Sequence, residues 1–119
     1  MANVVYKMCA RGDWEEACAA GSYTGSSHDA RDGFIHLSAA DQLAETAAKH
    51  FSGTPDLVVI AFDADALGAA LRWEPSRGGA LFPHLYGPLP TTEALFVADA
   101  PLRDGGVPDV TAALTRAQT

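Results

Sequence analysis

The sequence has few cysteines and no long hydrophobic run. Its two cysteines, Cys9 and Cys18, form no C-x-x-C pair, and no cysteine–histidine cluster has zinc-finger spacing. Reduced thiols are typical of cytosolic proteins. No apolar run approaches the roughly 20 residues that cross a bilayer, and the first residues do not resemble a signal peptide. We therefore expect a cytoplasmic protein that spans no membrane.

Positive charge is also scarce, because 15 acidic residues face 8 basic ones and the formal net charge is -7. Proteins that hold duplex nucleic acid carry a basic face for the phosphates, so a nucleic-acid partner is not expected. The sequence lacks G-x-G-x-x-G, a P-loop and a G-x-S-x-G elbow. A metal site built from His36, His84 and Cys9 or Glu74 has no supporting spacing such as H-x-x-x-H, so no metal is predicted.

Apolar residues make up 48% of the 119-residue chain, which is enough to fill the core of one domain covering residues 1–119. The hydrophobic pattern predicts an α+β fold, with small mixed sheets on which two or three helices pack. The expected strands cover residues 4–8, 34–37, 57–62, 71–74 and 94–98. Helices are expected over 13–20, from 38 to about 51, over 63–70 and over 109–116, and residues 22–32 are expected to form a loop.

Several residues are expected to set the ends of these elements. Asp13, Ser38, Asp63 and Asp109 stand at positions typical of helix N-caps, and Gly21 at a position typical of a helix C-terminus. The three prolines of residues 82–90 predict an irregular segment or an edge strand there.

His36 is the first candidate site residue, because it lies within an otherwise apolar strand and shares a face with Phe34 and Ser38. Taken alone, it is explained more simply as a half-buried histidine bound to a backbone carbonyl, since nothing in the spacing requires a role. Ser38 has a structural explanation as a helix cap, yet amides at a helix N-terminus also favour an anionic ligand group.

The segment Phe82-Pro-His-Leu-Tyr-Gly-Pro-Leu-Pro90 is the second candidate. Its prolines make it stiff, so it would present His84 and Tyr86 from one side as preorganised ligand contacts. The alternative is a proline-rich edge that prevents aggregation. Glu74 is a candidate general base, although an exposed carboxylate at a strand end is the simpler explanation. Arg31 is a candidate phosphate ligand, although a solvated loop arginine is the default. His28 and His50 receive no role.

Taken together, these segments resemble a bacterial family known as domain of unknown function 952. The resemblance rests on Tyr6-Lys7, Trp14, Gly33-Phe-Ile-His-Leu-Ser38, Gln42, the strand at 57–62, Glu74 and the 82–90 segment. It covers residues from about 4 to about 101. More distantly, the chain is similar to the ADP-ribosyltransferase-like fold, which binds NAD in a cleft between two small sheets, and within it to the RNA 2'-phosphotransferases.

The distant resemblance implies NAD or an ADP-ribose-like nucleotide as ligand, and transfer or hydrolysis of an ADP-ribosyl group as reaction. In those transferases the first strand carries His-Gly-Thr, where this chain has Lys7-Met8-Cys9, and Phe34 replaces the first histidine of their H-x-H-L strand. Removal of a tRNA 2'-phosphate is therefore not expected.

Roles can still be assigned by that resemblance. His36 would bond a ribose hydroxyl, Glu74 would supply a carboxylate near the developing positive charge, and His84 would position the acceptor or act as a base. Tyr86 would stack on a ring, with Ser38 and Arg31 binding the cofactor. Two other interpretations remain open: a non-catalytic module that binds a ligand or a protein, and a thiol-handling protein that uses Cys9.

Overall fold

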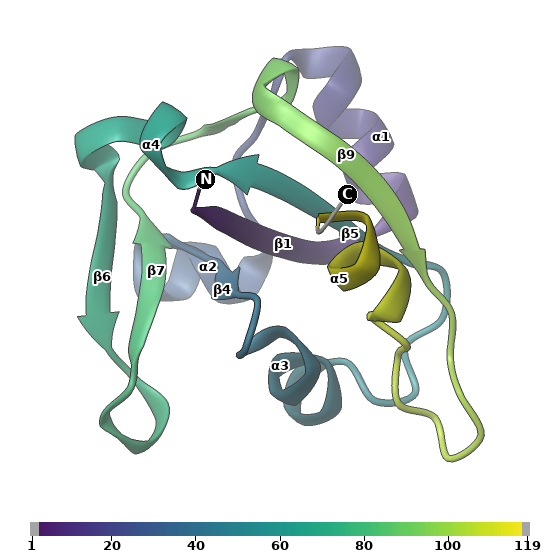
Figure 1. Ribbon diagram of the computed structural model, residues 1–119. Coiled ribbons are helices and arrows are strands. Elements are labelled where there is room, and N and C mark those ends of the chain that lie inside the picture. Colours follow the sequence, from purple (N-terminus) through teal and green to yellow (C-terminus); the bar gives the residue numbers. More distant parts are fainter. Residues whose placement is uncertain (1–2, 118–119) are drawn as a thin grey trace.

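The computed structural model describes residues 3–117, and of Arg77 its backbone alone (Figure 1). The helices are α1 (Arg11–Ala20), α2 (Ser27–Asp32), α3 (Leu43–His50), α4 (Ala64–Leu67) and α5 (Thr111–Ala117). The strands are β1 (Val4–Ala10), β2 (Ser22–Tyr23), β3 (Ile35–His36), β4 (Ser38–Ala39), β5 (Leu57–Asp63), β6 (Leu71–Pro75), β7 (Leu81–Leu85), β8 (Leu89–Pro90) and β9 (Ala94–Ala100). Short 3-10 helices follow α4, β6 and β8.

Three antiparallel sheets organise the chain. The largest has the strand order β4-β1-β5-β9, a second has the order β3-β7-β6, and β2 pairs with β8. The α+β class is confirmed, although the described pairings are antiparallel rather than mixed. No described helix is long and apolar enough to cross a membrane.

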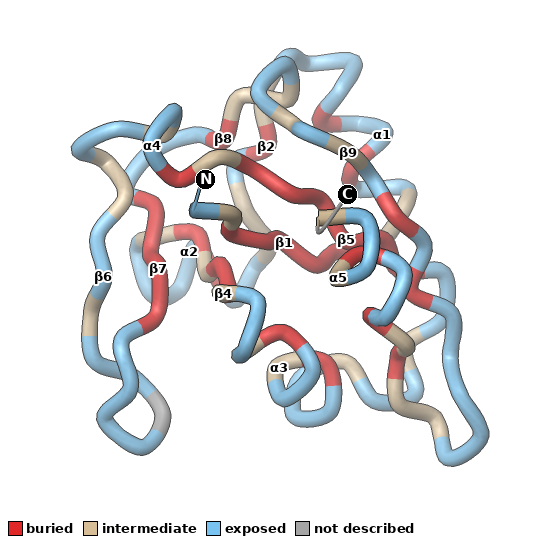
Figure 2. Tube along the Cα trace, in the orientation of Figure 1, coloured by how far each residue is buried: buried red, intermediate tan, exposed pale blue. Residues whose placement is uncertain are grey.

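The four-stranded sheet is covered on both faces, and alternate residues of β1 point into two separate cores. Val5 and Cys9 join a cluster with Trp14 of α1 and Leu85 of β7, on the side of the three-stranded sheet. On the opposite face, Tyr6 and Met8 belong to a second cluster, formed with residues of α3 and α5. Figure 2 shows β1 and β5 buried along most of their length, while β6 is largely exposed.

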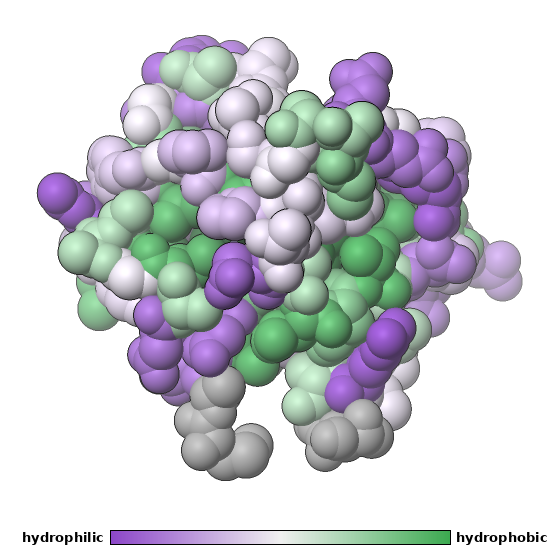
Figure 3. Space-filling view, turned by 90° about the horizontal axis from the view of Figure 1, so that it is seen from above, coloured by the Kyte–Doolittle hydropathy of each residue, from purple (hydrophilic) through white to green (hydrophobic). Residues whose placement is uncertain are grey.

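The exterior mixes apolar and polar groups. Seen from above, green apolar atoms lie in recesses between purple and pale polar side chains (Figure 3). The apolar surface of this face is thus divided by polar residues.

Local signals predicted several elements correctly. β1, β5, β6 and β9 lie where strands were expected, and α1 ends at Gly21 in the left-handed conformation. Asp63 caps α4 by accepting from the amide of Asp65, and Asp109 accepts from the amide of Thr111 at the start of α5.

Two predicted caps are wrong. Helix α1 begins at Arg11, directly after β1, so Asp13 lies inside its first turn; the amide of Arg11 instead donates to the carbonyl of Asp56. Ser38 belongs to β4, paired with Tyr6, and α3 begins five residues later at Leu43. The hydroxyl of Ser38 contacts that of Thr46 at 3.1 Å.

Two further predictions need correction. Residues 22–32 contain β2 and α2 rather than a loop. The proline-rich segment contains β7, which is the central strand of its sheet rather than an edge. Pro83 is tolerated there because β3 pairs only with His84 and Leu85. The carbonyl of Pro83 accepts from the amide of Leu37, which lies beyond the end of β3. Proline has no N–H to donate, but at this point β3 has ended and the ladder requires no donor from Pro83.

Candidate functional site

A cavity of about 650 Å³ lies beside β1, between the four-stranded and the three-stranded sheets. All four histidines of the chain line it, from α2, β3, α3 and β7: His28, His36, His50 and His84. Small-molecule sites typically have volumes of about 300–1,000 Å³. The convergence of every histidine on one cavity marks this region as the candidate site.

An open strand edge forms one wall of the cavity. β4 pairs with Val5 and Tyr6 alone, so the same edge of β1 has no partner strand among the described residues from Lys7 to Ala10. Residues 6–10 line the cavity. This wall includes Lys7, Met8 and Cys9.

Asp29 is the buried centre of a polar network. Its Oδ2 accepts from Nζ of Lys7 at 2.9 Å, and its Oδ1 lies 2.6 Å from Nδ1 of His36. Backbone amides of Ser26 and His36 also donate to this carboxylate. Burial raises the pKa of Asp29, but the bond from His36, the charge of Lys7 and the amides together outweigh it and hold the pKa well below its usual range.

Helix α2 is built so that Asp29 has this position. Ser26 and Asp29 form a capping box, in which the Ser26 hydroxyl accepts from the Asp29 amide and the Asp29 carboxylate accepts from the Ser26 amide. Gly33 then ends the helix with a φ of 86°, a conformation that glycine adopts without strain. This turn leads the chain into β3 and brings His36 beneath the helix.

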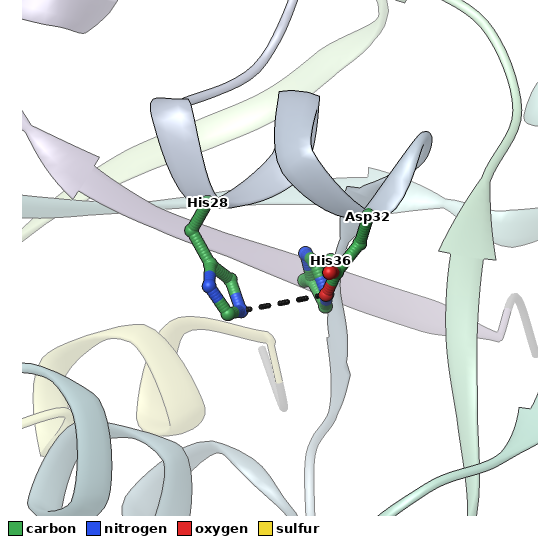
Figure 4. Close-up of side chains that lie close together, drawn as sticks. All are labelled: His28, Asp32 and His36. Carbon is green, nitrogen blue, oxygen red and sulfur yellow. Dashed lines mark hydrogen bonds and ion pairs between the residues drawn. The ribbon is translucent and has the colours of Figure 1, made fainter.

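A second group of polar side chains lies at the exposed end of the same network. His28 and Asp32 are four residues apart on one face of α2, and the ring of His36 comes up against them from β3 (Figure 4). Nε2 of His36 lies 2.9 Å from Oδ2 of Asp32, and Nε2 of His28 lies 3.8 Å from the same oxygen. Arg31 donates to Nδ1 of His28 at 2.6 Å.

His84 lies next to His36 but has different partners. The two histidines face each other across β3 and β7, with ring centroids 5.7 Å apart. Nδ1 of His84 lies 2.8 Å from Glu74 Oε1, which also accepts from the hydroxyl of Tyr86 at 2.8 Å. The ring of Phe34 stacks on His84 at 4.0 Å. The bonds from His84 and Tyr86 lower the pKa of Glu74, and the bond to Glu74 raises the pKa of Tyr86.

Two further polar residues of the cavity wall, Cys9 and Tyr23, are buried. Burial raises the pKa of Cys9 to about 12, against a smaller opposing effect of Lys7. The hydroxyl of Tyr23 is buried and has no hydrogen-bond partner among the described residues. A buried hydroxyl without a partner is costly, and this oxygen is shielded from the cavity by the side chains around it.

A family model described as "Protein of unknown function (DUF952)" matches residues 8–97. The chain belongs to the DUF952 family. It is similar to protein CC0527 from Caulobacter crescentus, whose crystal structure is 49% identical over 94% of this chain and 98% of that chain, with a TM-score of 0.91. The solution structure of CC0527 gives 49% identity, coverage of 92% and 95%, and a TM-score of 0.82. No curated protein matches the chain.

The structure of this DUF952 chain brings some expected site residues together and separates others. His36, His84 and Ser38 line the cavity. Glu74 and Tyr86 do not line it; Glu74 contacts Nδ1 of His84, and Tyr86 donates to Glu74. Arg31 lies on the outer side, bonded to His28. Both ring nitrogens of His36 already have carboxylate partners, so a ribose hydroxyl would have to displace one of them.

Four polar residues of the site were missed by reading the sequence: Lys7, His28, Asp29 and Asp32. The spacing His28-x3-Asp32-x3-His36 and the Ser26-x-x-Asp29 capping pattern are both visible in the sequence. Neither pattern singles these residues out, because a segment so rich in serine and glycine predicts a loop. Lys7 carries no local signal, since its partner is 22 residues away.

Proposed function

We propose that this DUF952 chain binds a small nucleotide of the NAD or ADP-ribose type in the histidine-lined cavity, with His84 acting on it as acid or base. The observation that carries the proposal is the gathering of all four histidines around one cavity. Titratable groups converging on a concave, largely apolar pocket are typical of ligand sites.

His84 is better suited to proton transfer than His36. A carboxylate that accepts from one ring nitrogen fixes the tautomer and leaves the other nitrogen free to take a proton. Glu74 holds Nδ1 of His84 in this way, and no described residue bonds to its Nε2. Phe34 stacks on the ring and restricts its rotation. Glu74 and Tyr86 thus act as positioning residues behind His84.

The nucleotide class is supported by the place of the cavity and by the family resemblance. The ADP-ribosyltransferase-like fold holds NAD between two small sheets, and this cavity lies between two such sheets. In hydrolysis, water would attack C1' of the ribose as the bond to nicotinamide breaks. His84 would accept the proton of that water.

A non-catalytic binding module is the second candidate, and the environment of Lys7 favours it. Lys7 stands where the transferases carry the first-strand histidine that holds NAD. Its ammonium group is already bound to Asp29 and to the carbonyl of His36. Asp13, Asp29 and Asp32 also line the cavity, and these carboxylates would repel a diphosphate.

Thermal unfolding with NAD, ADP-ribose or nicotinamide tests the proposal. A ligand at 100 times its Kd adds about 2.7 kcal/mol to the free energy of unfolding, which raises Tm by several degrees in a domain of this size. The matched variants are His84→Gln and Glu15→Gln, the latter exposed on α1. We expect a shift with NAD or ADP-ribose in the wild type and in Glu15→Gln.

Release of nicotinamide from NAD separates the two candidates. Turnover that is lost in His84→Gln while the Tm shift persists would support catalysis by His84. A Tm shift without turnover in the wild type would support the binding module. If none of the three compounds changes Tm, the nucleotide proposal is wrong.

A further inference from the structure

We infer that His28, Asp32 and His36 form a binding site for one divalent transition-metal ion of the zinc type. One nitrogen from each imidazole and one oxygen of Asp32 lie within 4.8 Å of one another. This inference goes beyond the nucleotide proposal and does not depend on it.

The distances between the three groups suit a metal centre. Ligand atoms about 2.0–2.2 Å from a tetrahedral zinc ion are roughly 3.4 Å apart. Oδ2 of Asp32 lies 2.9 Å from Nε2 of His36 and 3.8 Å from Nε2 of His28, which brackets that separation. The three side chains lie close together in Figure 4, so small side-chain rotations would bring all three to bonding distance.

The local fold holds the ligands in place before any ion arrives. His28 and Asp32 are one helical turn apart on α2, and the turn at Gly33 returns His36 to the same face. The three residues follow the spacing His-x3-Asp-x3-His. A metal bound here would close a loop of nine residues, counted from His28 to His36.

Asp29 provides an independent argument for the site. Metal-binding histidines commonly donate their second ring N–H to a carboxylate, which fixes the tautomer and strengthens the ligand. Oδ1 of Asp29 lies 2.6 Å from Nδ1 of His36, and the carboxylate is fixed by Lys7 and by two backbone amides. The ring is therefore held with Nε2 directed toward Asp32 and His28.

The donor set indicates the class of ion. Two imidazoles with one carboxylate suit zinc and neighbouring first-row ions, whereas magnesium and calcium prefer all-oxygen sites. Three protein ligands leave a coordination position open, as in catalytic rather than structural zinc sites. All three residues line the cavity, so that position would face a bound ligand, close to the ring of His84.

Zinc titration of the untagged, chelator-treated protein tests the inference. The wild type is expected to bind one equivalent of zinc, with no comparable binding of magnesium. His28→Ala and Asp32→Asn should each weaken zinc binding by about tenfold or more. Both residues are exposed, so these variants should fold, which circular dichroism would verify.

Two control variants address adventitious binding. Asp13→Asn removes a cavity carboxylate outside the proposed ligands, and Cys18→Ser removes the exposed thiol. Both should keep the wild-type zinc affinity. In Asp29→Asn, zinc binding should weaken by about 10- to 100-fold. Equal zinc affinity in the wild type, His28→Ala and Asp32→Asn would overturn the inference, as would loss of binding in Cys18→Ser.

Zinc binding and nucleotide binding can fail separately. A chain that binds zinc but none of the three nucleotide probes leaves the metal site standing and removes the proposed function. A chain that binds NAD but takes up no zinc would support the proposed function and overturn the metal site.

Discussion

Cys9 and Cys18 are chemically different thiols although both are free. Cys9 lies on β1 in the wall of the cavity and is 5% exposed, whereas Cys18 is exposed on α1. Burial disfavours the thiolate of Cys9 and raises its pKa to about 12. Since the thiolate is the nucleophile, Cys9 is poorly suited to thiol chemistry at neutral pH.

Alkylation of the native protein with iodoacetamide should therefore distinguish the two cysteines. At pH 8 we expect one modification per chain, at Cys18, as measured by peptide mass spectrometry. Because the pKa of Cys9 is raised, its thiolate fraction is small at pH 8 and grows as the pH approaches that pKa, and its labelling rate should follow. Denatured protein should be labelled at both sites. Equal labelling of the two cysteines in native protein at pH 8 would contradict the burial of Cys9.

Arg31 is expected to have opposite effects on the two proposed ligands. Its guanidinium donates to Nδ1 of His28, which favours the tautomer whose proton is on Nε2, the nitrogen that would bind a metal. Arg31→Ala would release Nδ1 and remove a nearby positive charge, so zinc binding should tighten by roughly threefold to tenfold. An anionic nucleotide that uses Arg31 should bind more weakly to the same variant. Calorimetric titration with each ligand measures both changes, and weaker zinc binding would contradict this account of Arg31.

Helix α2 carries four of the polar residues of the site, and its position depends on the turn before it. Gly25 has a φ of 107°, and a Cβ at this position would lie 2.9 Å from Cβ of Asp29 and 3.2 Å from its Oδ2. Gly21 has a similar φ of 94° but nothing within 4 Å of a built Cβ. The two glycines thus form a matched pair. Alanine would strain the backbone at both positions, but only at position 25 would it also clash with Asp29.

Gly21→Ala should lower the free energy of unfolding by about 1–2 kcal/mol, the typical cost of a left-handed conformation outside glycine. Gly25→Ala should carry this cost plus roughly 1–3 kcal/mol for the forced displacement of Asp29. Urea unfolding of both variants measures the difference. Equal losses would show that α2 shifts freely and that Asp29 is not tightly held.

Helices and strands were predicted correctly where the signal is local in the sequence. The prediction failed where pairing with a distant strand determines the secondary structure. β5 was predicted because its apolar run is continuous, and α5 because Asp109 precedes it. The pattern Ser-x-x-Asp occurs at both Ser26 and Ser38, yet it caps a helix only at Ser26. Pairing with Tyr6 draws Ser38 into the sheet, and nothing local to Ser38 encodes that pairing.

The candidate site was predicted in part for the same reason. His36 and His84 were both identified from their own segments, but the registration that places them opposite each other comes from the β3–β7 pairing. The pairing of Lys7 with Asp29 joins residues 22 positions apart, and no periodicity in the sequence predicts it. The residues that were missed are those whose role depends on the assembled chain.

Lys7 connects two layers of the molecule through that pair. It lies on β1 of the four-stranded sheet, and its ammonium group binds Asp29 of α2 and the carbonyl of His36 on β3 of the second sheet. Lys7 and Asp29 are 5% and 2% exposed. Removing Lys7 would leave the buried carboxylate of Asp29 without its ammonium partner, held by His36 and two backbone amides alone. Breaking a buried pair in this way costs more than the pair itself contributes.

Lys7→Met should therefore lower the free energy of unfolding by about 3 kcal/mol, whereas Lys49→Met, on the exposed face of α3, should change it by less than about 1 kcal/mol. Urea unfolding of both variants measures this. Because the loss in Lys7→Met comes from a buried carboxylate that has lost its ammonium partner, adding Asp29→Asn should cost much less in that background than in the wild type. If the two losses were simply additive, Lys7 and Asp29 would not be coupled, and apolar packing alone would join the two sheets across the cavity.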